Sequence, residues 1–219
     1  MKLFDATGPN PRVVRMFAAE KALDIPAEVM VLSIGEARSP AHLARNPMGE
    51  VPVLETDGGA FIAETVAICE YLEELHPEPV LIGRSAEERA QTRMWARRVD
   101  LKICEPIIHG FKFSPVSFHP DGGLFPVDAH VADAMKALAR AHLAWFDGQL
   151  QDRAYLCGER YSLADILLYC FLQYGIEIGQ LLRPEWRALA GWFDRVAMRP
   201  AAADSAQCKL GSKSLDGTV

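Results

Sequence analysis

The sequence predicts a small α/β domain followed by a larger all-helical domain. Over residues 1–76, strand-like and helix-like patterns follow one another in the order βαβ, α, ββα, which predicts a mixed sheet covered by helices. Beyond Pro77 and Pro79, strand-like alternation is absent and only helical patterns follow. We therefore expect an α/β domain at 1–76, a linker at 77–84, a helical domain at 85–207 and a disordered polar tail at 208–219.

Apolar spacing and turn residues define the elements of the first domain. Val13, Val14, Phe17 and Ala18 recur at helical spacing and predict an amphipathic helix at 12–23. A short helix begins at the Ser39-Pro40 pair, with the serine as its cap. The strands are expected at residues 2–5, 28–32, 51–55 and 60–62, the last two joined by a hairpin at 56–59, and a third helix is expected at 64–75.

The second domain is expected to contain four helices. They are predicted at 86 to about 110, at 129–150, from residue 162, and at 186–196, with a proline-containing loop at 113–126. Ser162 and Asp165 have the spacing of a capping box, in which each side chain bonds the other residue's backbone.

Composition excludes several classes of function. The 219 residues include 23 basic and 29 acidic side chains, giving a formal net charge of −6, and the basic residues are scattered. Binding to nucleic acid or an anionic membrane needs clustered positive charge, so neither partner is expected. No apolar run approaches the roughly 18–20 residues of a membrane span, and the N-terminus lacks a signal-peptide pattern, so we expect a cytoplasmic protein.

The cysteines and histidines are dispersed along the chain. The five cysteines form no CxxC motif, and the six histidines form no closely spaced ligand pairs. Such a distribution predicts reduced, mostly buried thiols and no structural metal.

The segment from Asn46 to Leu54 carries the first motif. A proline that enters a strand cannot donate to the ladder, so Pro52 belongs at the first position of its strand. After the tight Pro-Met-Gly turn, the Val51–Pro52 bond is a candidate for the cis form. This geometry would leave the N–H and C=O of Val51 free to pair with an extended peptide ligand. A buried turn without a ligand is the alternative.

The second motif is the Glu64-Thr65 pair at the expected start of a helix. Free N–H groups and the helix dipole favour an anion there. The Thr65 hydroxyl can contact a carboxylate while Glu64 accepts from an ammonium group, so together they could hold an α-amino acid headgroup. Plain helix capping is the alternative.

In this order and spacing, the motifs resemble those of the glutathione transferase superfamily. The resemblance extends from the Pro9-Asn10-Pro11-Arg12 stretch, through the two motifs above, to the Ser162-Asp165 box. It implies the glutathione transferase fold, a thioredoxin-like domain followed by a helical bundle, usually in a homodimer. It also implies glutathione as a co-substrate, with no metal, whose thiolate attacks a small apolar electrophile.

The resemblance also implies roles for single residues. In the bacterial Nu-type pattern, an Asn after Pro and a nearby Thr face the glutathione thiol, which makes Asn10 the donor and Thr7 its neighbour. The alternative is that Asn10 only caps the helix. The residues implied to bind glutathione are Val51 and Pro52 at its cysteinyl part, Glu64 and Thr65 at its γ-glutamyl end, and Arg38 and Glu50 near its glycyl end.

Two residues depart from the family pattern. Glu50 places a negative charge where a positive or neutral side chain is usual, which predicts weak glutathione binding unless Arg38 offsets it. The first helix usually ends Lys-Gly, but here it ends Lys21-Ala22. A left-handed Ala22 would cost about 1 kcal/mol relative to glycine.

The second-substrate pocket is expected on the long helix after the linker and on the loop that follows. His109, Phe111, Phe113 and Phe118 are its candidates, with packing in the helical core as the alternative. Two other functions stay open: glutathione-dependent disulfide reduction through the bound thiol, and a non-catalytic interaction protein of the same fold.

Overall fold

A four-stranded mixed sheet forms the N-terminal layer of the computed structural model, which describes residues 1–32, 35–115, 127–180 and 182–208. Its strands are β1 (Lys2–Asp5), β2 (Ala27–Val29), β3 (Val53–Glu55) and β4 (Phe61–Ala63), in the spatial order β2-β1-β3-β4. β1 pairs parallel with β2 and antiparallel with β3, and β3 pairs antiparallel with β4. The mixed sheet predicted from the pattern is confirmed.

β2 is shorter than the strand predicted at 28–32. The N–H of Met30 still bonds the Asp5 carbonyl at 2.8 Å, but the N–H of Val31 donates to Glu36 Oε2 at 2.7 Å. The chain therefore leaves the ladder at Val31 because a side chain takes over the hydrogen bond.

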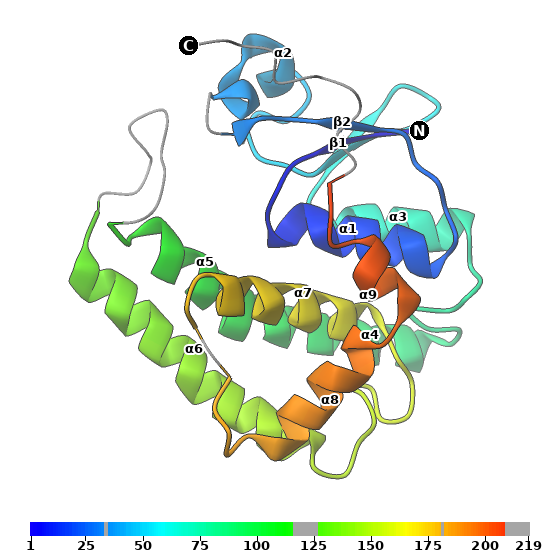
Figure 1. Cartoon of the computed structure of the whole chain (residues 1–219). Helices are drawn as coiled ribbons and strands as arrows, with labels where there is room; N and C mark the ends of the chain where they lie inside the picture. The colour runs from blue at the N-terminus through cyan, green and yellow to red at the C-terminus, as the bar shows by residue number, and fades with distance from the viewer. Residues whose placement is uncertain (33–34, 116–126, 181, 209–219) are drawn as a thin grey trace.

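Two helices lie between the sheet and the helical domain. Figure 1 shows α1 (Pro9–Glu20) and α3 (Thr65–Leu75) side by side beneath the strands, whereas the short η2 (Glu36–Arg38) and α2 (Pro40–Leu43) lie on the opposite side. Val13, Val14 and Phe17 on α1 are fully buried, in agreement with the predicted apolar face. Ser39 caps α2 as predicted, since its Oγ accepts from the N–H of His42 at 3.3 Å.

α1 ends three residues before the predicted limit, in a left-handed turn. The N–H of Leu23 bonds the Ala18 carbonyl at 2.9 Å, and the N–H of Ala22 bonds the Ala19 carbonyl at 3.0 Å. This pattern is a Schellman motif, which places its C′ residue in the left-handed region. Ala22 occupies that position with a φ of 53°, so the cost considered for a left-handed alanine applies here.

The helical domain is built around α7 (Leu163–Glu177), whose residues 163–172 are all buried. The single helix predicted at 86–110 is instead α4 (Ala86–Val99), a π-helical segment η3 (Asp100–Cys104) and α5 (Glu105–Lys112). α6 (Ala129–Leu150) and α8 (Arg187–Ala197) follow the prediction closely, and the short α9 (Pro200–Asp204) was not predicted. Every regular element that the structure describes after β4 is helical.

The predicted capping box at the start of α7 forms part of a larger buried network. Asp165 accepts from the N–H and the hydroxyl of Ser162 at 3.0 and 2.9 Å. It also accepts from the Leu156 N–H and the Trp192 indole N–H, both at 2.9 Å. Burial raises the pKa of the Asp165 carboxyl to about 6, while these hydrogen bonds act to lower it.

A buried ion pair holds the linker to the first domain. Lys21 Nζ lies 2.6 Å from Glu73 Oε2, and both side chains are almost completely buried. The same ammonium donates to the carbonyls of His76 and Pro79, while Glu73 accepts from the N–H groups of Leu81 and Ile82. The chain between α3 and α4 is thereby fixed by side chains from the first domain.

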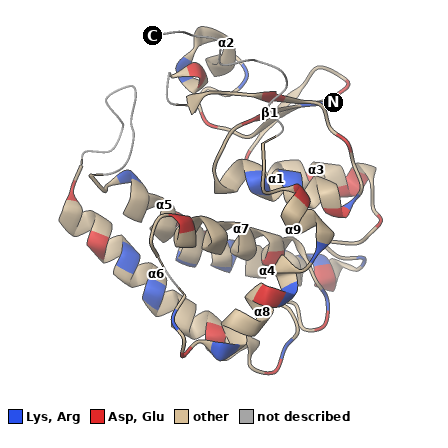
Figure 2. Ribbon diagram, viewed as in Figure 1, with Lys and Arg blue, Asp and Glu red and all other residues tan. Residues whose placement is uncertain are grey.

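Charged residues of both signs are interspersed over the surface. Figure 2 shows both basic and acidic residues along α6. Among the described residues, no helix is long and apolar enough to cross a membrane, and no cluster of three His, Cys, Asp or Glu side chains has the arrangement of a metal site. All five cysteines are free thiols, and all but Cys208 are buried, as the sequence predicts.

Candidate functional site

A cleft of about 450 Å³ lies between the two domains. One wall comes from the turn after β1, the start of α1 and parts of the segment between β2 and β3, including η2; the other comes from η3, α5 and α7. Of the predicted site residues, the cleft is lined by Thr7, Asn10, Arg38, Glu50, Val51 and His109.

The start of α1 places a side-chain amide in this cleft. Gly8, with a φ of 123°, occupies the N-cap position, so Asn10 is the second residue of the helix and does not cap it. Pro9 and Pro11 flank Asn10, and neither has a backbone N–H. Of the first three helical residues, only Asn10 can therefore offer N–H donors at this helix end.

The Val51–Pro52 bond is cis, as predicted. The preceding turn is fixed by buried side chains, because Asn46 Nδ2 donates to the Glu50 carbonyl at 2.9 Å and His42 Nε2 lies 3.0 Å from the same oxygen. Val51 lines the cleft next to this turn, whereas Pro52 is buried beneath it.

Arg38 packs against the same turn. Its Nη1 donates to the Met48 carbonyl at 2.9 Å. Gly49 lies beside it with a φ of 63°, a conformation that favours glycine, and a Cβ there would lie 2.9 Å from the backbone carbonyl oxygen of Ala37. Arg38 lines the cleft, and its guanidinium also supports the loop that leads to the cis bond.

Glu64 and Thr65 lie at the N-terminus of α3, as predicted. Glu64 is exposed and has a φ of 69°, a conformation that costs a non-glycine residue energy and is enriched at functional sites. Thr65 is only 9% exposed, and its Oγ1 donates to Asn10 Oδ1 at 3.2 Å. Neither residue lines the cleft itself, but Thr65 joins α3 to the start of α1 through this bond.

The helical wall of the cleft follows one face of α5. Glu105, Ile108, His109 and Lys112 line it at positions i, i+3, i+4 and i+7. Phe111 is two residues beyond His109, about 200° around the helix, and packs against Tyr174 with ring centroids 5.8 Å apart. For Phe111 the core-packing alternative therefore fits better.

The other predicted aromatic residues do not line the cleft. Phe113 lies next to His109, with ring centroids 6.0 Å apart, at the end of α5. Phe118 lies outside the described residues.

Charged groups from both domains face the cleft. Glu50 Oε1 lies 3.7 Å from Lys112 Nζ, so an ion pair spans the opening between the domains. On α5, His109 Nδ1 lies 3.6 Å from Glu105 Oε2. Asp100 adds a further carboxylate, while Ile108 and Phe171 supply the apolar part of the wall.

Cys104 also lines the cleft, but its surroundings disfavour the reactive thiolate form. Burial raises the pKa of this thiol well above its usual range, and the neighbouring Asp100 and Glu105 raise it further. Because the thiolate is the nucleophilic form, Cys104 stays an unreactive thiol at neutral pH. A thiol chemistry in this cleft needs a thiol brought in by a ligand.

Several lining residues were missed from the sequence. Lys112, Glu105 and Ile108 share the helical face of His109, so that spacing could have identified them once His109 was chosen. Asp100 and Phe171 carried no such signal. The first lies in the π-helical segment, which shifts the helical phase, and the second lies on a different helix.

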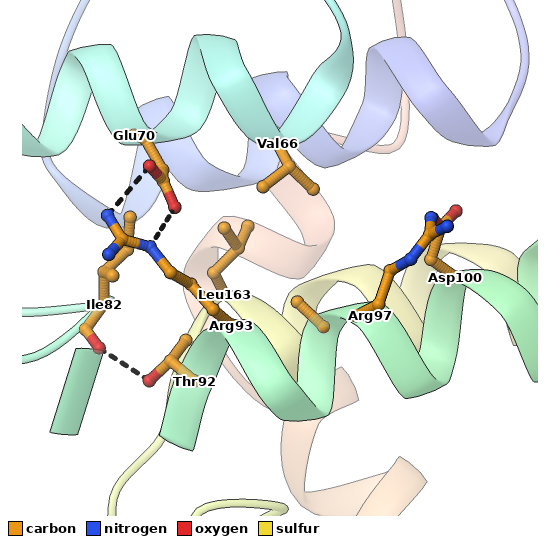
Figure 3. A pocket seen from close by; sticks show the side chains of 9 residues that line it. Val66, Glu70, Ile82, Thr92, Arg93, Arg97, Asp100 and Leu163 are labelled. Atoms are coloured by element: carbon orange, nitrogen blue, oxygen red, sulfur yellow. Dashed lines mark hydrogen bonds and ion pairs between the residues drawn. The ribbon is translucent and has the colours of Figure 1, made fainter. Parts of the chain in front are cut away.

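A smaller pocket lies between α3 and α4 and shares Asp100 with this cleft. It has a volume of about 270 Å³, and Figure 3 shows Val66 and Glu70 of α3 facing Arg93 and Arg97 of α4 across it. Arg93 bonds both carboxylate oxygens of Glu70, at 2.7 and 3.0 Å, which ties the two domains together at this face.

Comparison with known proteins agrees with this architecture. Residues 3–80 match the glutathione S-transferase N-terminal domain family, and residues 105–200 match the glutathione S-transferase C-terminal domain family. Glutathione S-transferase 2 of Saccharomyces cerevisiae is 32% identical over 205 residues, which cover 92% of this chain and 87% of the yeast protein.

Solved structures give the same result. The crystal structure of Gtt2 from Saccharomyces cerevisiae superposes with a TM-score of 0.89 at 30% identity, covering 94% of this chain and 100% of the yeast chain. A glutathione S-transferase domain-containing protein of Marinobacter aquaeolei superposes with a TM-score of 0.87 at 31% identity, covering 92% and 99%. With a thioredoxin-like domain, a helical domain and matches over both, this chain belongs to the glutathione S-transferase family and is an enzyme homologous to Gtt2.

Proposed function

We propose that the protein is a glutathione transferase that adds the glutathione thiolate to a small apolar electrophile. The observation that carries the proposal is the juxtaposition of Asn10, at the start of α1, and Val51, beside the cis bond, on one wall of the interdomain cleft. Asn10 offers hydrogen-bond donors for a thiolate, and Val51 offers backbone groups for a peptide. The domains would extend over 1–76 and 85–207, in a cytoplasmic protein.

Glutathione would lie along the N-terminal wall of the cleft. Its cysteinyl backbone would pair with Val51, and its γ-glutamyl end would approach Glu64 and the N-terminus of α3. The glycyl end would then point toward Arg38 and Glu50, which line the same wall. The electrophile would occupy the space against α5 and α7, where Ile108 and Phe171 supply apolar surface and His109 a polar edge.

Thiol activation is assigned to Asn10. A free thiol titrates near 8.5, so hydrogen bonds to the thiolate are needed to favour that form at neutral pH. Helix N-termini supply such donors through backbone N–H groups, but Pro9 and Pro11 remove two of the first three here. The side-chain amide of Asn10 supplies N–H donors in place of the two backbone N–H groups that the prolines lack. Its place after Pro9 agrees with the bacterial Nu-type pattern.

Replacing Asn10 with alanine should therefore raise the pKa of bound glutathione and lower turnover at neutral pH by about 10- to 100-fold. Thr7→Ala is the matched comparison, because Thr7 lines the same cleft but is exposed, and it should have a smaller effect. The pKa of the bound thiol can be followed by thiolate absorbance. Equal and negligible effects of both substitutions would remove Asn10 as the donor.

Two assays separate transfer from the alternative, glutathione-dependent disulfide reduction. With a chloronitrobenzene acceptor, a transferase forms the thioether and releases chloride. With a small disulfide, a reductase oxidises two glutathione molecules to one glutathione disulfide and releases two free thiols. We expect the first activity to exceed the second. A calorimetric titration with glutathione that shows no binding would contradict both.

A homodimer is the proposed assembly. The apolar Met94 of α4 and Leu101 of η3 are 42% and 47% exposed, and each follows in the chain a residue that lines the α3–α4 pocket, Arg93 and Asp100. A second copy would cover them. Light scattering should give twice the chain mass, and Met94→Asp should shift it toward the monomer. Met198→Asp, which changes a methionine that is 85% exposed at the end of α8, is the control and should not.

A further inference from the structure

The hydrogen bond between Thr65 and Asn10 joins the first residue of α3 to the second residue of α1. Thr65 Oγ1 donates to Asn10 Oδ1 at 3.2 Å. An asparagine amide has an acceptor oxygen at one end and an NH₂ donor at the other. Because the hydroxyl takes the oxygen, the donor end of Asn10 is the one left for a ligand in the cleft that Asn10 lines.

We propose that Thr65 is a positioning residue, whose hydroxyl holds the Asn10 amide so that Nδ2 and not Oδ1 faces the thiolate sulfur. The inference rests on the proposed function, in which Asn10 is the thiolate donor. It gives the Thr65 side chain a task different from the contact with the γ-glutamyl carboxylate that the sequence resemblance implies. The carboxylate can still be met by the backbone N–H groups at the start of α3.

The surroundings of the two residues explain why this bond matters. The rings of Pro9 and Pro11 fix the backbone on both sides of Asn10, so the remaining freedom lies in its side chain. A half-turn of the amide exchanges oxygen for nitrogen with almost no change in shape. Oδ1 would repel a thiolate. Thr65 is nearly buried and branched at Cβ, so its side chain has little rotamer freedom. Its hydroxyl therefore favours one of the two orientations of the Asn10 amide.

Thr65→Val keeps the shape of the side chain and removes its hydroxyl. A hydrogen bond of ordinary net strength is lost, so the pKa of bound glutathione should rise by about 0.5 to 1 pH unit. At pH 6.5, kcat/KM should fall about three- to tenfold, with the loss shrinking as the pH rises. Thr65→Ser retains a hydroxyl and should restore both values, which also guards against a folding defect in the valine variant.

A double-mutant cycle tests whether Thr65 acts through Asn10. The substitution Thr65→Val is made in the wild-type protein and in Asn10→Ala, and the thiol pKa is measured in all four proteins by thiolate absorbance. S-methylglutathione, which has no titrating thiol, reports headgroup binding separately. We expect a pKa rise from Thr65→Val in the wild-type background and none in the Asn10→Ala background, whereas any loss of S-methylglutathione affinity should be the same in both backgrounds.

The outcomes distinguish a failure of the positioning role of Thr65 from a failure of the thiolate-donor role of Asn10. If Asn10→Ala raises the pKa but Thr65→Val does not, or raises it equally in both backgrounds, the positioning role is wrong and the proposed function stands. The positioning role is also wrong if Thr65→Val weakens S-methylglutathione binding and leaves the pKa unchanged. If Asn10→Ala leaves the pKa unchanged, the assignment of Asn10 fails, and the inference about Thr65 fails with it.

Discussion

At the scale of single residues, Glu50 has a partner that the sequence did not reveal. The sequence places its negative charge near the expected glycyl carboxylate, with Arg38 as the only candidate for compensation. In the structure Arg38 bonds the Met48 carbonyl, and Lys112 of the helical domain lies 3.7 Å from the Glu50 carboxylate. The side chain of Glu50 is 57% exposed, so solvent screens much of this interaction.

Glu50→Gln should tighten glutathione binding about two- to fivefold at low salt, and less at high salt. The substitution removes a like charge near the glycyl carboxylate and leaves Lys112 to attract it. Lys112→Gln should act in the opposite direction. Asp152→Asn, an exposed site beyond the end of α6, changes the net charge equally and is the control for calorimetric titrations. A dissociation constant that Glu50→Gln leaves unchanged at every salt concentration would show that Glu50 does not face the ligand.

At the scale of elements, the C-terminus of α1 and the N-terminus of α7 both form recognisable capping motifs. α1 ends in a Schellman motif, but its left-handed position carries alanine where glycine is favoured. α7 begins with a capping box whose aspartate is completely buried and also bonds α8 through Trp192. Each of these ends gives a measurable prediction.

Ala22→Gly should raise the free energy of unfolding by about 1 kcal/mol. Glycine adopts a φ of 53° without the Cβ strain that alanine suffers there, and this gain exceeds the entropy that glycine adds to the unfolded chain. Ala137→Gly, at an exposed position inside α6, should instead lower stability by about 0.5–1 kcal/mol. Urea unfolding measures both, and a loss at both sites would argue against the strain at Ala22.

Asp165 should make stability fall as the pH rises from about 4 to about 6. Burial raises its pKa to about 6, so in this window the native state holds a proton that the unfolded chain, with a pKa near 3.9, has released. The contribution is complete below about pH 4, and up to about 3 kcal/mol is lost by pH 7. Unfolding measured against pH should show this slope in the wild-type protein and in Asp152→Asn, but not in Asp165→Asn. Parallel curves for all three would contradict the raised pKa.

At the scale of the whole molecule, one continuous buried apolar cluster joins the two domains, and a few charged groups fix the linker between them. Lys21 and Glu73 are buried together, and between them they bond four backbone groups of residues 76–82. On the neighbouring face, Glu70 and Arg93 pair α3 with α4. These charged groups add to the apolar packing that already joins the domains.

Glu73→Ala should therefore destabilise the protein by about 3–5 kcal/mol, because it leaves the Lys21 ammonium buried without its carboxylate. Glu73→Gln should cost less, since its amide oxygen still accepts from the linker N–H groups. Glu74→Ala, at the exposed neighbouring position, should change stability by no more than about 0.5 kcal/mol. If chemical unfolding gives similar losses for residues 73 and 74, the buried pair does not hold the linker.

The sequence by itself determined the order of elements, the fold class and the motifs that begin or end helices. Local patterns suffice for these features, because apolar periodicity, caps and turn residues act over a few neighbouring residues. Ser39, Ser162 with Asp165 and the cis bond at Pro52 were predictable in this way, and the structure contains each of them.

Only the tertiary structure decided which side chains meet across the cleft. Thr65 and Asn10 are 55 residues apart in the chain, and Glu50 and Lys112 belong to different domains. The π-helical segment interrupts the helix that the apolar pattern predicts as continuous, and Phe111 of α5 packs against Tyr174 of α7. Such contacts depend on how packed helices are rotated and placed, and local propensity does not encode that information.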